Sequence, residues 1–259
     1  MTQNKLFDKK APMILAQARF SVRFACNKKE VEQAQKLRYK AFVDEFGVEF
    51  SNKQSGIDED RFDKYCLHLL LIDDDKQKIV GTYRLLTAQG TKKAGGWYSA
   101  SEFDLSPFKP LMPEMIEVGR ACIHKDYRLG KGGALLLLWR GLIETMKRLN
   151  CRYFIGCGSV PIRDGGAYAV QVYKKIQEKG ALIDQKYFIE AKNPLDLSLT
   201  PQEGQEYPGL PVLIRGYLKL GAVICSFPSV DPIFKTADMM ILFDKEKSNQ
   251  RYLKKILKA

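Results

Sequence analysis

The chain has 259 residues, of which 45% are hydrophobic and 28% are charged, a composition typical of a globular protein with enough apolar residues for a sizeable core. Its formal net charge of +12 indicates a negatively charged partner, such as nucleic acid, an anionic membrane surface or an acidic protein. No stretch approaches the roughly 18 apolar residues of a membrane-spanning helix. The apolar patch after Lys5, Lys9 and Lys10 is too short for a secretory signal, so the sequence predicts a cytoplasmic protein.

The hydrophobic pattern predicts alternating strands and helices in the first three quarters of the chain. In chain order they are a strand at 20–27, a helix at 28–46 between Asn27 and Gly47, an acidic loop at 47–65, hairpin strands at 66–72 and 78–88, a strand before the glycine-rich turn at 127–133, a helix ending at Asn150, a buried strand from 151 and a helix at 164–179. This order predicts the α/β class, with a mixed sheet and helices packed on it.

The last quarter of the chain reads as an extension of the same domain. Four prolines between residues 193 and 211 indicate an irregular excursion. A helix is expected in "PVLIRGYLKLGA", strands in "AVICSF" and "DMMILF", and a short basic helix at 245–259. We therefore expect a core at residues 20–192 and a C-terminal extension at 193–259.

The sequence lacks the motifs of metal sites and of nucleic-acid-binding proteins. The six cysteines lack the paired spacings of a zinc or redox site and are expected to be reduced thiols. The two histidines, His68 and His124, lie in separate strands or strand ends, and His68 is expected to pack in the core. No zinc-finger spacing or RNA-binding aromatic motif occurs, so we expect neither a metal nor a nucleic-acid partner.

A carboxylate in an apolar strand is the first functional signal. Glu117 stands among Met115, Ile116 and Val118, where a core-facing carboxylate costs several kcal/mol unless it is paired, neutralised or beside a cavity. The turn "YRLGKGG" follows it and opens a helix. Backbone N–H groups at such a turn can bind a phosphate, although the turn could equally be glycine-rich without a ligand.

The strand "EVGR", the turn "YRLG" and the order of elements resemble the GNAT acyltransferase superfamily, whose turn holds the pantetheine arm of the donor. That resemblance implies a GNAT fold. Measured from Arg128, Lys131 stands where the superfamily motif Q/R-x-x-G-x-G/A has its first glycine. A carrier protein offers one phosphodiester instead of a pyrophosphate and needs less of a cradle, so acyl carrier protein is the expected donor and acyl-CoA is less favoured. No cofactor is expected.

The sequence is similar in more detail to acyl-carrier-protein-dependent ornithine N-acyltransferases and, more distantly, to acyl-homoserine-lactone (autoinducer) synthases. The shared motifs are "LRYKAF", "DEDRFD", "TYRLL" and "EVGR", in the same order, and the ornithine acyltransferase likeness continues through "DPIFKTAD". The resemblance implies transfer of a fatty acyl group, with a 3-hydroxyl, to the α-amine of ornithine or a similar amino acid. The alternatives are an autoinducer synthase using S-adenosylmethionine and a non-catalytic lipid- or carrier-protein-binding module.

The resemblance and the chemistry of acyl transfer together single out site residues. Glu117, with a pKa raised by apolar neighbours, could deprotonate the acceptor ammonium directly or through water. Tyr173 could protonate the departing thiolate or could simply pack in the core. Strict alternation places Arg120 on the face opposite Glu117, so either Arg120 serves elsewhere or a β-bulge intervenes. Such a bulge is common in the superfamily that the sequence resembles and would expose backbone N–H groups to the substrate. The residues expected to bind the donor or the acceptor are Arg38, Phe42, Asp60, Asp63, Arg84, Arg120, Arg128, Gly130, Gly132 and Arg215.

The charge network and Arg215 each have a second interpretation without a role in binding. Arg38, Asp60, Asp63 and Arg84 could form a charge network that orders the acidic loop, or could be surface ion pairs worth under about 1 kcal/mol each. Arg215 could hold a substrate carboxylate or could be a solvated helix residue.

The net positive charge of the chain fits the expected partners. Acyl carrier proteins are acidic, so the positive charge could steer the donor. The basic helix at 245–259 and the N-terminal lysines with Met13–Leu15 could rest peripherally on anionic lipid, or could be solvated chain ends.

Overall fold

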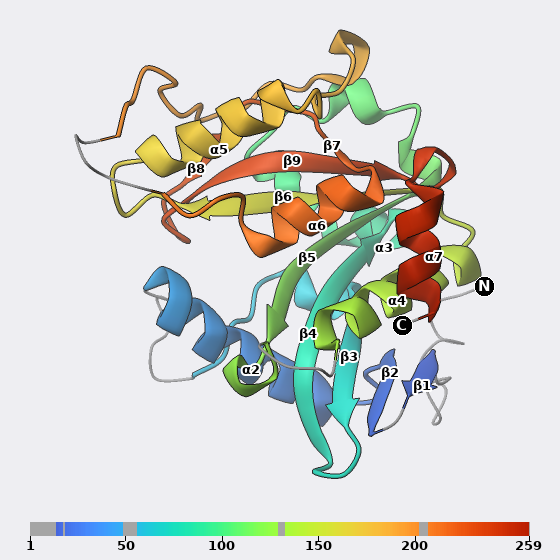
Figure 1. Ribbon diagram of the computed structural model, residues 1–259. Coiled ribbons are helices and arrows are strands. Elements are labelled where there is room, and N and C mark those ends of the chain that lie inside the picture. The colour runs from blue at the N-terminus through green and yellow to red at the C-terminus, as the bar shows by residue number, and fades with distance from the viewer. Residues whose placement is uncertain (1–13, 18, 49–55, 129–132, 202–206, 259) are drawn as a thin grey trace.

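The computed structural model describes residues 14–17, 19–48, 56–128, 133–201 and 207–258, with only the backbone at 44–46. Within this part, nine strands form a single sheet (Figure 1). They are β1 (Leu15–Gln17), β2 (Phe20–Phe24), β3 (Leu67–Asp73), β4 (Lys78–Thr87), β5 (Met115–Ile123), β6 (Tyr153–Pro161), β7 (Val223–Ile224), β8 (Ser229–Asp231) and β9 (Thr236–Asp244).

The strand order is β1-β2-β3-β4-β5-β6-β9-β7, with β8 paired to β9. Every pairing is antiparallel except the one between β5 and β6. β9 pairs with β6 over the full length of both strands, from Tyr153 opposite Asp244 to Pro161 opposite Thr236. The C-terminal extension therefore supplies an interior strand of the same sheet.

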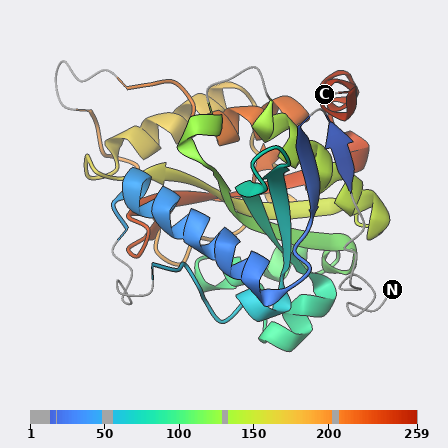
Figure 2. The ribbon, with the colours of Figure 1, turned by 90° about the horizontal axis from the view of Figure 1, so that it is seen from below.

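Helices cover both faces of the sheet (Figure 2). The α-helices are α2 (Lys28–Phe46), α3 (Ala88–Ala94), α4 (Ala134–Arg148), α5 (Ala167–Glu178), α6 (Val212–Leu220) and α7 (Gln250–Lys258). The 3-10 helices are η1 (Asp63–Tyr65), η2 (Tyr98–Ser101), η3 (Ser106–Phe108), η4 (Met112–Glu114), η5 (Lys125–Tyr127), η6 (Gln185–Tyr187) and η7 (Lys245–Lys247). The predicted α/β class, with a mixed sheet flanked by helices, is confirmed.

The main core lies between the sheet and the helices α4, α5, α6 and α7. A second apolar cluster lies on the other face, under η2, η3 and the chain around Ile189. That second face also carries α2 and α3 (Figure 2). We call the first the helical face and the second the α2 face.

Local signals explain where α2 begins and ends. The side chain of Asn27 accepts a hydrogen bond from the backbone N–H of Glu30, and Gly47 ends the helix with a left-handed φ of 61°. Both ends agree with the sequence prediction. The helix α3 was not predicted, because its sequence "AQGTKKA" has no amphipathic stripe.

Two segments expected at a lipid surface are packed in the main core instead. Leu253 and Ile256, the apolar residues of α7, are buried against the main core, and so are Ile14 and Leu15 near the N-terminus. These four apolar side chains are therefore not exposed for contact with lipid, and peripheral association of the two segments with anionic lipid stays a prediction. Lys5, Lys9, Lys10 and Met13 lie outside the described residues.

Two further sequence expectations concern cysteines and membrane spans. All six cysteines are free thiols, as predicted. None of the helices in the described ranges is both long and apolar enough to cross a membrane.

Candidate active site

The parallel strands β5 and β6 separate partway along their length. Only Met115–Glu117 of β5 pair with Tyr153–Ile155 of β6, and beyond this point the two strands diverge (Figure 1). Gly156 stands at the fork, where a Cβ atom would collide with the carbonyl oxygen of Val118. The edge of β5 that faces β6 beyond Glu117 is therefore left without a strand partner, and a substrate can approach its backbone there.

A bulge directs two polar residues of β5 to one face of the sheet. The register with β4 shifts between Thr82 and Arg84, and Arg120 opposite this point has a positive φ of 50°. Normal alternation would place Arg120 on the face away from Glu117. The bulge instead turns its guanidinium toward the α2 face, so the predicted bulge is confirmed.

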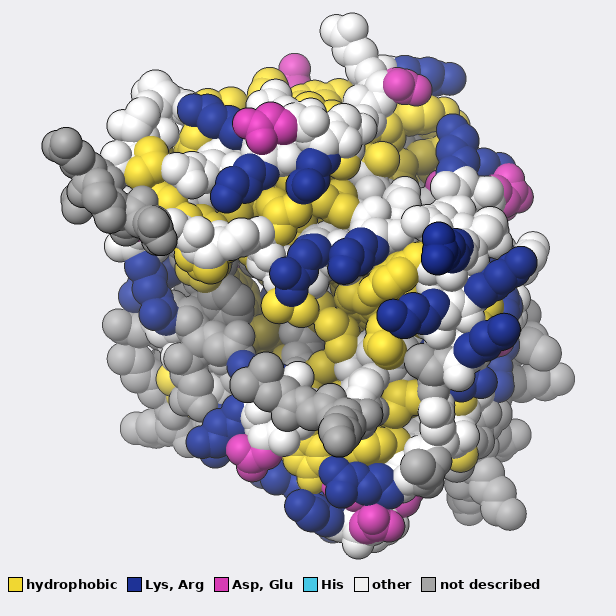
Figure 3. Space-filling view, in the orientation of Figure 1, with side chains coloured by type: hydrophobic (Ala, Val, Ile, Leu, Met, Phe, Trp, Pro, Cys, Tyr) yellow, Lys and Arg dark blue, Asp and Glu magenta, His cyan; other side chains and the backbone are white. Residues whose placement is uncertain are grey.

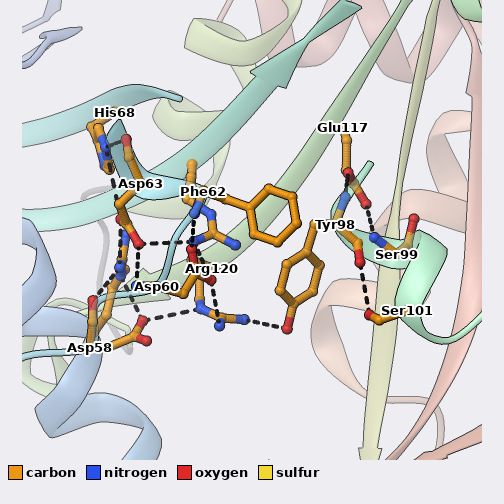
Figure 4. Close-up of polar contacts among 12 residues, drawn as sticks. Asp58, Asp60, Phe62, Asp63, His68, Tyr98, Ser99, Ser101, Glu117 and Arg120 are labelled. Atoms are coloured by element: carbon orange, nitrogen blue, oxygen red, sulfur yellow. Dashed lines mark hydrogen bonds and ion pairs between the residues drawn. The ribbon is translucent and has the colours of Figure 1, made fainter. Parts of the chain in front are cut away.

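The carboxylate of Glu117 caps the 3-10 helix η2. Its Oε2 accepts the backbone N–H of Tyr98 at 2.7 Å and its Oε1 that of Ser99 at 2.8 Å (Figure 4). The side chain is buried, and burial raises the pKa of Glu117 while the Ser99 side chain and the two backbone N–H groups oppose the rise. The carboxylate is therefore held in place with an elevated pKa.

A buried ion-pair network joins α2, β3 and β4 on the α2 face. Arg38 of α2 donates from Nη2 to Oδ1 of Asp63 at 2.9 Å, and Arg84 of β4 donates to Oδ2 at 3.0 Å. The backbone oxygen of Asp63 lies 3.0 Å from Nε2 of His68. Burial alone would raise the pKa of Asp63, but the two arginines hold it below the ordinary value. Arg84 also donates to Oδ2 of Asp60 at 2.6 Å. The contacts predicted among Arg38, Asp60, Asp63 and Arg84 are therefore confirmed.

Arg120 extends this network toward Glu117. Its guanidinium lies 3.1 Å from Asp58 and 3.2 Å from Asp60, and it donates to the hydroxyl of Tyr98 at 3.1 Å. Burial alone would lower the pKa of Arg120, but Tyr98 and the two carboxylates raise it above the ordinary value. Figure 4 shows Tyr98 between the network and Glu117, with its hydroxyl on Arg120 and its backbone N–H on Glu117.

The turn between β8 and β9 reaches the same region from the C-terminal extension. The ring of Phe234 lies 5.5 Å from that of Phe42 on α2, and the guanidinium of Arg120 lies 4.5 Å above it. Phe42, predicted to bind substrate, therefore forms part of an aromatic contact that joins α2 to the turn "DPIFKTAD".

A second group of acids lies near the fork. Ligand atoms of Glu102, Cys157 and Asp238 lie within 4.8 Å of one another. The spacing would suit a metal ion, but burial and the surrounding carboxylates raise the pKa of the Cys157 thiol far above its ordinary value. Because a metal binds the thiolate, this donor set fits a metal poorly.

Other predicted site residues lie on the helical face. Tyr173 of α5 is buried in the main core, with its ring 5.8 Å from that of Phe227. Arg215 of α6 is exposed and lines a cavity of about 150 Å³ with Lys219, Leu136 and Trp139. The structure therefore does not place Arg215 beside Glu117. Lys and Arg side chains surround a hollow with an apolar floor on this face (Figure 3).

The glycine-rich turn is described only in part. Arg128 is exposed and donates from Nε to the carbonyl of Ile123 at 2.8 Å. Gly130 and Gly132 lie outside the described residues. Gly133, which is described, starts α4 with a φ of 59°.

Sequence reasoning missed four residues of this region: Asp58, Tyr98, Glu102 and Asp238. Asp58 lies in the acidic loop that was noticed, and its proximity to Asp60 was the available signal. Tyr98 and Glu102 lie in an irregular connection, and Asp238 follows far along the chain. No period or motif marks these three residues.

Comparison with known proteins agrees with the fold. The family model described as an acetyltransferase (GNAT) domain matches residues 37–140, from α2 to α4. This range includes the network, the bulge, Glu117 and the glycine-rich turn. The protein is thus a GNAT-fold acyltransferase.

Relatives that match about nine-tenths of the chain identify the family within this class of acyltransferases. The chain is 31% identical to an L-ornithine N(alpha)-acyltransferase of Brucella abortus (strain 2308) over 245 residues, which cover 90% of this chain and 86% of the relative. It is also 31% identical to one of Rhizobium meliloti (strain 1021) over 253 residues, 91% of this chain and 83% of the relative. The chain belongs to the L-ornithine N(alpha)-acyltransferase family.

Solved structures share the fold at low sequence identity. The acyl-homoserine-lactone synthase LasI superposes with a TM-score of 0.52 at 15% identity, over 92% of this chain and 95% of that one. FeeM, an N-acyl amino acid synthase from uncultured soil microbes, gives a TM-score of 0.50 at 10% identity, over 88% and 92%. Both likenesses extend through the C-terminal extension.

Proposed function

We propose that the enzyme transfers a 3-hydroxylated fatty acyl group from the thioester of acyl carrier protein to the α-amine of ornithine or a similar amino acid, giving a lyso-lipid. The single observation that carries this proposal is the 31% identity, over nine-tenths of the chain, to proteins named L-ornithine N(alpha)-acyltransferases.

Glu117 is the proposed general base. It takes a proton from the acceptor ammonium, directly or through one water, and the freed amine attacks the thioester carbonyl. The C–N bond forms, the C–S bond breaks, and the departing thiolate takes up a proton from Tyr173, the proposed donor. The second proton that the attacking nitrogen gives up then restores the Tyr173 hydroxyl. Unpaired backbone N–H groups of β5 at the fork are the proposed donors to the carbonyl oxygen as negative charge develops on it.

The donor is proposed to approach on the helical face. The cavity lined by Trp139, Arg215 and Lys219 lies on this face. Surrounding cations favour an acidic carrier protein (Figure 3). The same cations would attract an anionic membrane surface, which would receive the lipid product.

The first experiment combines product analysis with one substitution. Purified full-length enzyme is given 3-hydroxyacyl carrier protein and ornithine, and the amide is measured by mass spectrometry. We expect Glu117→Gln to lower the rate by about 10² to 10⁴. The Gln side chain has one acceptor oxygen for the two backbone N–H groups of Tyr98 and Ser99, and its NH2 group faces the other. The variant should therefore also lose about 1–3 kcal/mol of unfolding free energy.

Glu114→Gln is the matched control, because Glu114 is exposed three residues earlier in the chain. It should retain both rate and stability. Absence of an amide with every amino acid tried would refute the proposed function, and release of a lactone would favour an autoinducer synthase. A Glu117→Gln enzyme that is folded and fully active would refute the role of Glu117 alone.

A further inference from the structure

The carboxylates near the fork have no role in the proposed chemistry. Glu102 follows η2, and Asp238 and Asp231 lie in β9 and β8. The thiol of Cys157 in β6 lies 4.0 Å from Oε1 of Glu102. Asp238 and Asp231 are almost fully buried. Negative groups from three distant parts of the chain therefore converge at one place.

This place adjoins Glu117 on the α2 face. Ile155 pairs with Glu117, and Cys157, two residues further along β6, lies on the same face at the point where β5 has moved away. The 3-10 helix η2 also connects Glu117 with Glu102. The backbone N–H of Ser99 donates to the Glu117 carboxylate at 2.8 Å, and the backbone carbonyl of Ser99 accepts the N–H of Glu102 at 3.0 Å.

The carboxylates lack a cationic partner. No ion pair among the described residues includes Glu102, Asp231 or Asp238, and the neighbouring Arg120 is held by Asp58 and Asp60. Asp238 accepts a hydrogen bond from the hydroxyl of Thr236. The carboxylate of Asp231 accepts two backbone N–H groups of the β8–β9 turn.

Two buried polar atoms at this place have no partner. Oε2 of Glu102 is covered from solvent and makes no hydrogen bond within the described part of the chain. The hydroxyl of Ser99, a residue with no exposed surface, has no hydrogen bond of good geometry among the described residues, but its side chain lies by the Glu117 carboxylate (Figure 4) and helps to lower the pKa of that group. Leaving such atoms unsatisfied costs free energy that a donor from a ligand would recover.

The pKa values of these carboxyl groups agree with a positively charged ligand. Burial, with Asp238 and Asp231 nearby, raises the pKa of Glu102 to about 9, and burial likewise raises the pKa of Asp238 to about 6. Both shifts favour the protonated form of these carboxyl groups. A bound cation would supply the charge in place of the proton, and an ammonium offers three N–H donors to oxygen acceptors.

We propose that Glu102, Asp238 and Asp231 bind the side-chain ammonium group of a diamino acid while its α-amine lies at Glu117. This inference rests on the proposed function and deepens it, because it names the residues that would distinguish ornithine from an amino acid without a second amine. A monoamino acid would leave the buried carboxylates unpaired and would be rejected.

The test compares ornithine with norvaline, which has the same carbon chain without the second amine. For the wild-type enzyme we expect kcat/KM to favour ornithine by about 10² or more. In Glu102→Gln and in Asp238→Asn the ratio of the two kcat/KM values should fall at least tenfold. Asp104→Asn, exposed two residues after Glu102, is the control and should keep the wild-type ratio.

Calorimetric titration without acyl donor gives an independent readout. Ornithine should bind the wild type more tightly than norvaline does, and at least tenfold more tightly than it binds either variant. Equal binding of ornithine and norvaline by the wild type, or an unchanged ratio in both folded variants, would overturn the ammonium site. Ornithine binding without amide formation would instead refute the proposed acyl transfer and leave the binding inference supported.

Discussion

Arg38 illustrates how single residues hold the α2 face together. Its side chain is fully buried, with Nε 2.8 Å from Oδ2 of Asp58 and Nη2 2.9 Å from Oδ1 of Asp63. A charge this deep is tolerated only because acceptors surround it. Removal of one partner of such a pair leaves the other charge buried, so these contacts have a different energetic weight from surface ion pairs. They fix the loop that carries Asp60 against the strands.

Glu102 should give the stability of the protein a distinctive pH dependence. Its pKa rises from 4.5 in the unfolded chain to about 9 in the folded one, so the folded state binds this proton more tightly. Its contribution to stability is therefore complete below pH 4.5 and is lost as the pH rises toward 9. Glu102→Gln is neutral at every pH and should lose less unfolding free energy than the wild type between about pH 5 and about pH 9.

Urea unfolding across this range measures the effect. Asp104→Asn changes an exposed carboxylate nearby and should follow the wild-type pH profile. Parallel profiles for Glu102→Gln and the wild type would show that the Glu102 pKa is not raised on folding.

Sequence reasoning found residues that lie in motifs and missed those that only the fold brings together. Arg38 and Arg84 stand in regular elements beside apolar positions, and their contacts with Asp63 of the acidic loop were predicted. Glu102 and Asp238 are 136 positions apart (238 − 102) and meet only because β9 pairs with β6. No local pattern carries that information. The roles of Glu117 and Tyr173 in catalysis remain predictions that the experiments above address.

Among the secondary-structure elements, α6 shows how closely the helical face is packed. Gly216 lies against Trp139 of α4, and a Cβ atom at this position would overlap the indole ring. The indole N–H donates to the hydroxyl of Tyr83, which lies 2.6 Å from that of Tyr217. Close approach of α6 and α4 thus depends on the missing side chain.

Gly216→Ala should therefore destabilise the protein. The added methyl group must displace Trp139 and the buried hydroxyl pair, which should cost about 1–3 kcal/mol of unfolding free energy. Gly209→Ala is the matched control, since nothing lies within 4 Å of a Cβ built there. Thermal and urea unfolding of both variants measure the difference. Equal stability of Gly216→Ala and the wild type would mean that α6 can move away from α4 at no cost.

At the element level, periodic segments were predicted well and irregular ones were not. The bounds of α2 and of the β3–β4 hairpin agree with the sequence to within a residue or two. The helix predicted from residue 164 begins at Ala167, because Gly165 and Gly166 have positive φ values. The short strands β1 and β8 were missed, since three residues are too few to establish alternation.

For the molecule as a whole, the net charge of +12 predicts salt-sensitive encounter with an acidic donor. Cations gather on the helical face (Figure 3), where Arg215 and Lys219 line the cavity. With acyl carrier protein as donor, kcat/KM should fall by about tenfold or more between about 25 mM and about 250 mM NaCl. With acyl-CoA, a much smaller polyanion, the decrease should be weaker.

Steady-state kinetics with both donors check this prediction. The double variant Arg215→Gln, Lys219→Gln should lower kcat/KM for the carrier-protein donor at low salt and flatten its salt dependence. Lys92→Gln removes an exposed charge on the α2 face and should change neither. Identical salt profiles for the double variant and the wild type would exclude this face as the docking surface.

The buried ion pairs that join α2, β3, β4 and β5 have a consequence for substrate range. A wall tied together in this way cannot widen without separating enclosed charges, so with the proposed acceptor at Glu117 it would set a fixed size for the amino acid. The opposite wall, made of α4 and α6, is joined by apolar contacts and one buried hydroxyl pair. Variation in fatty-acid length among related enzymes should therefore follow side-chain volume in α4 and α6, while the choice of amino acid stays the same.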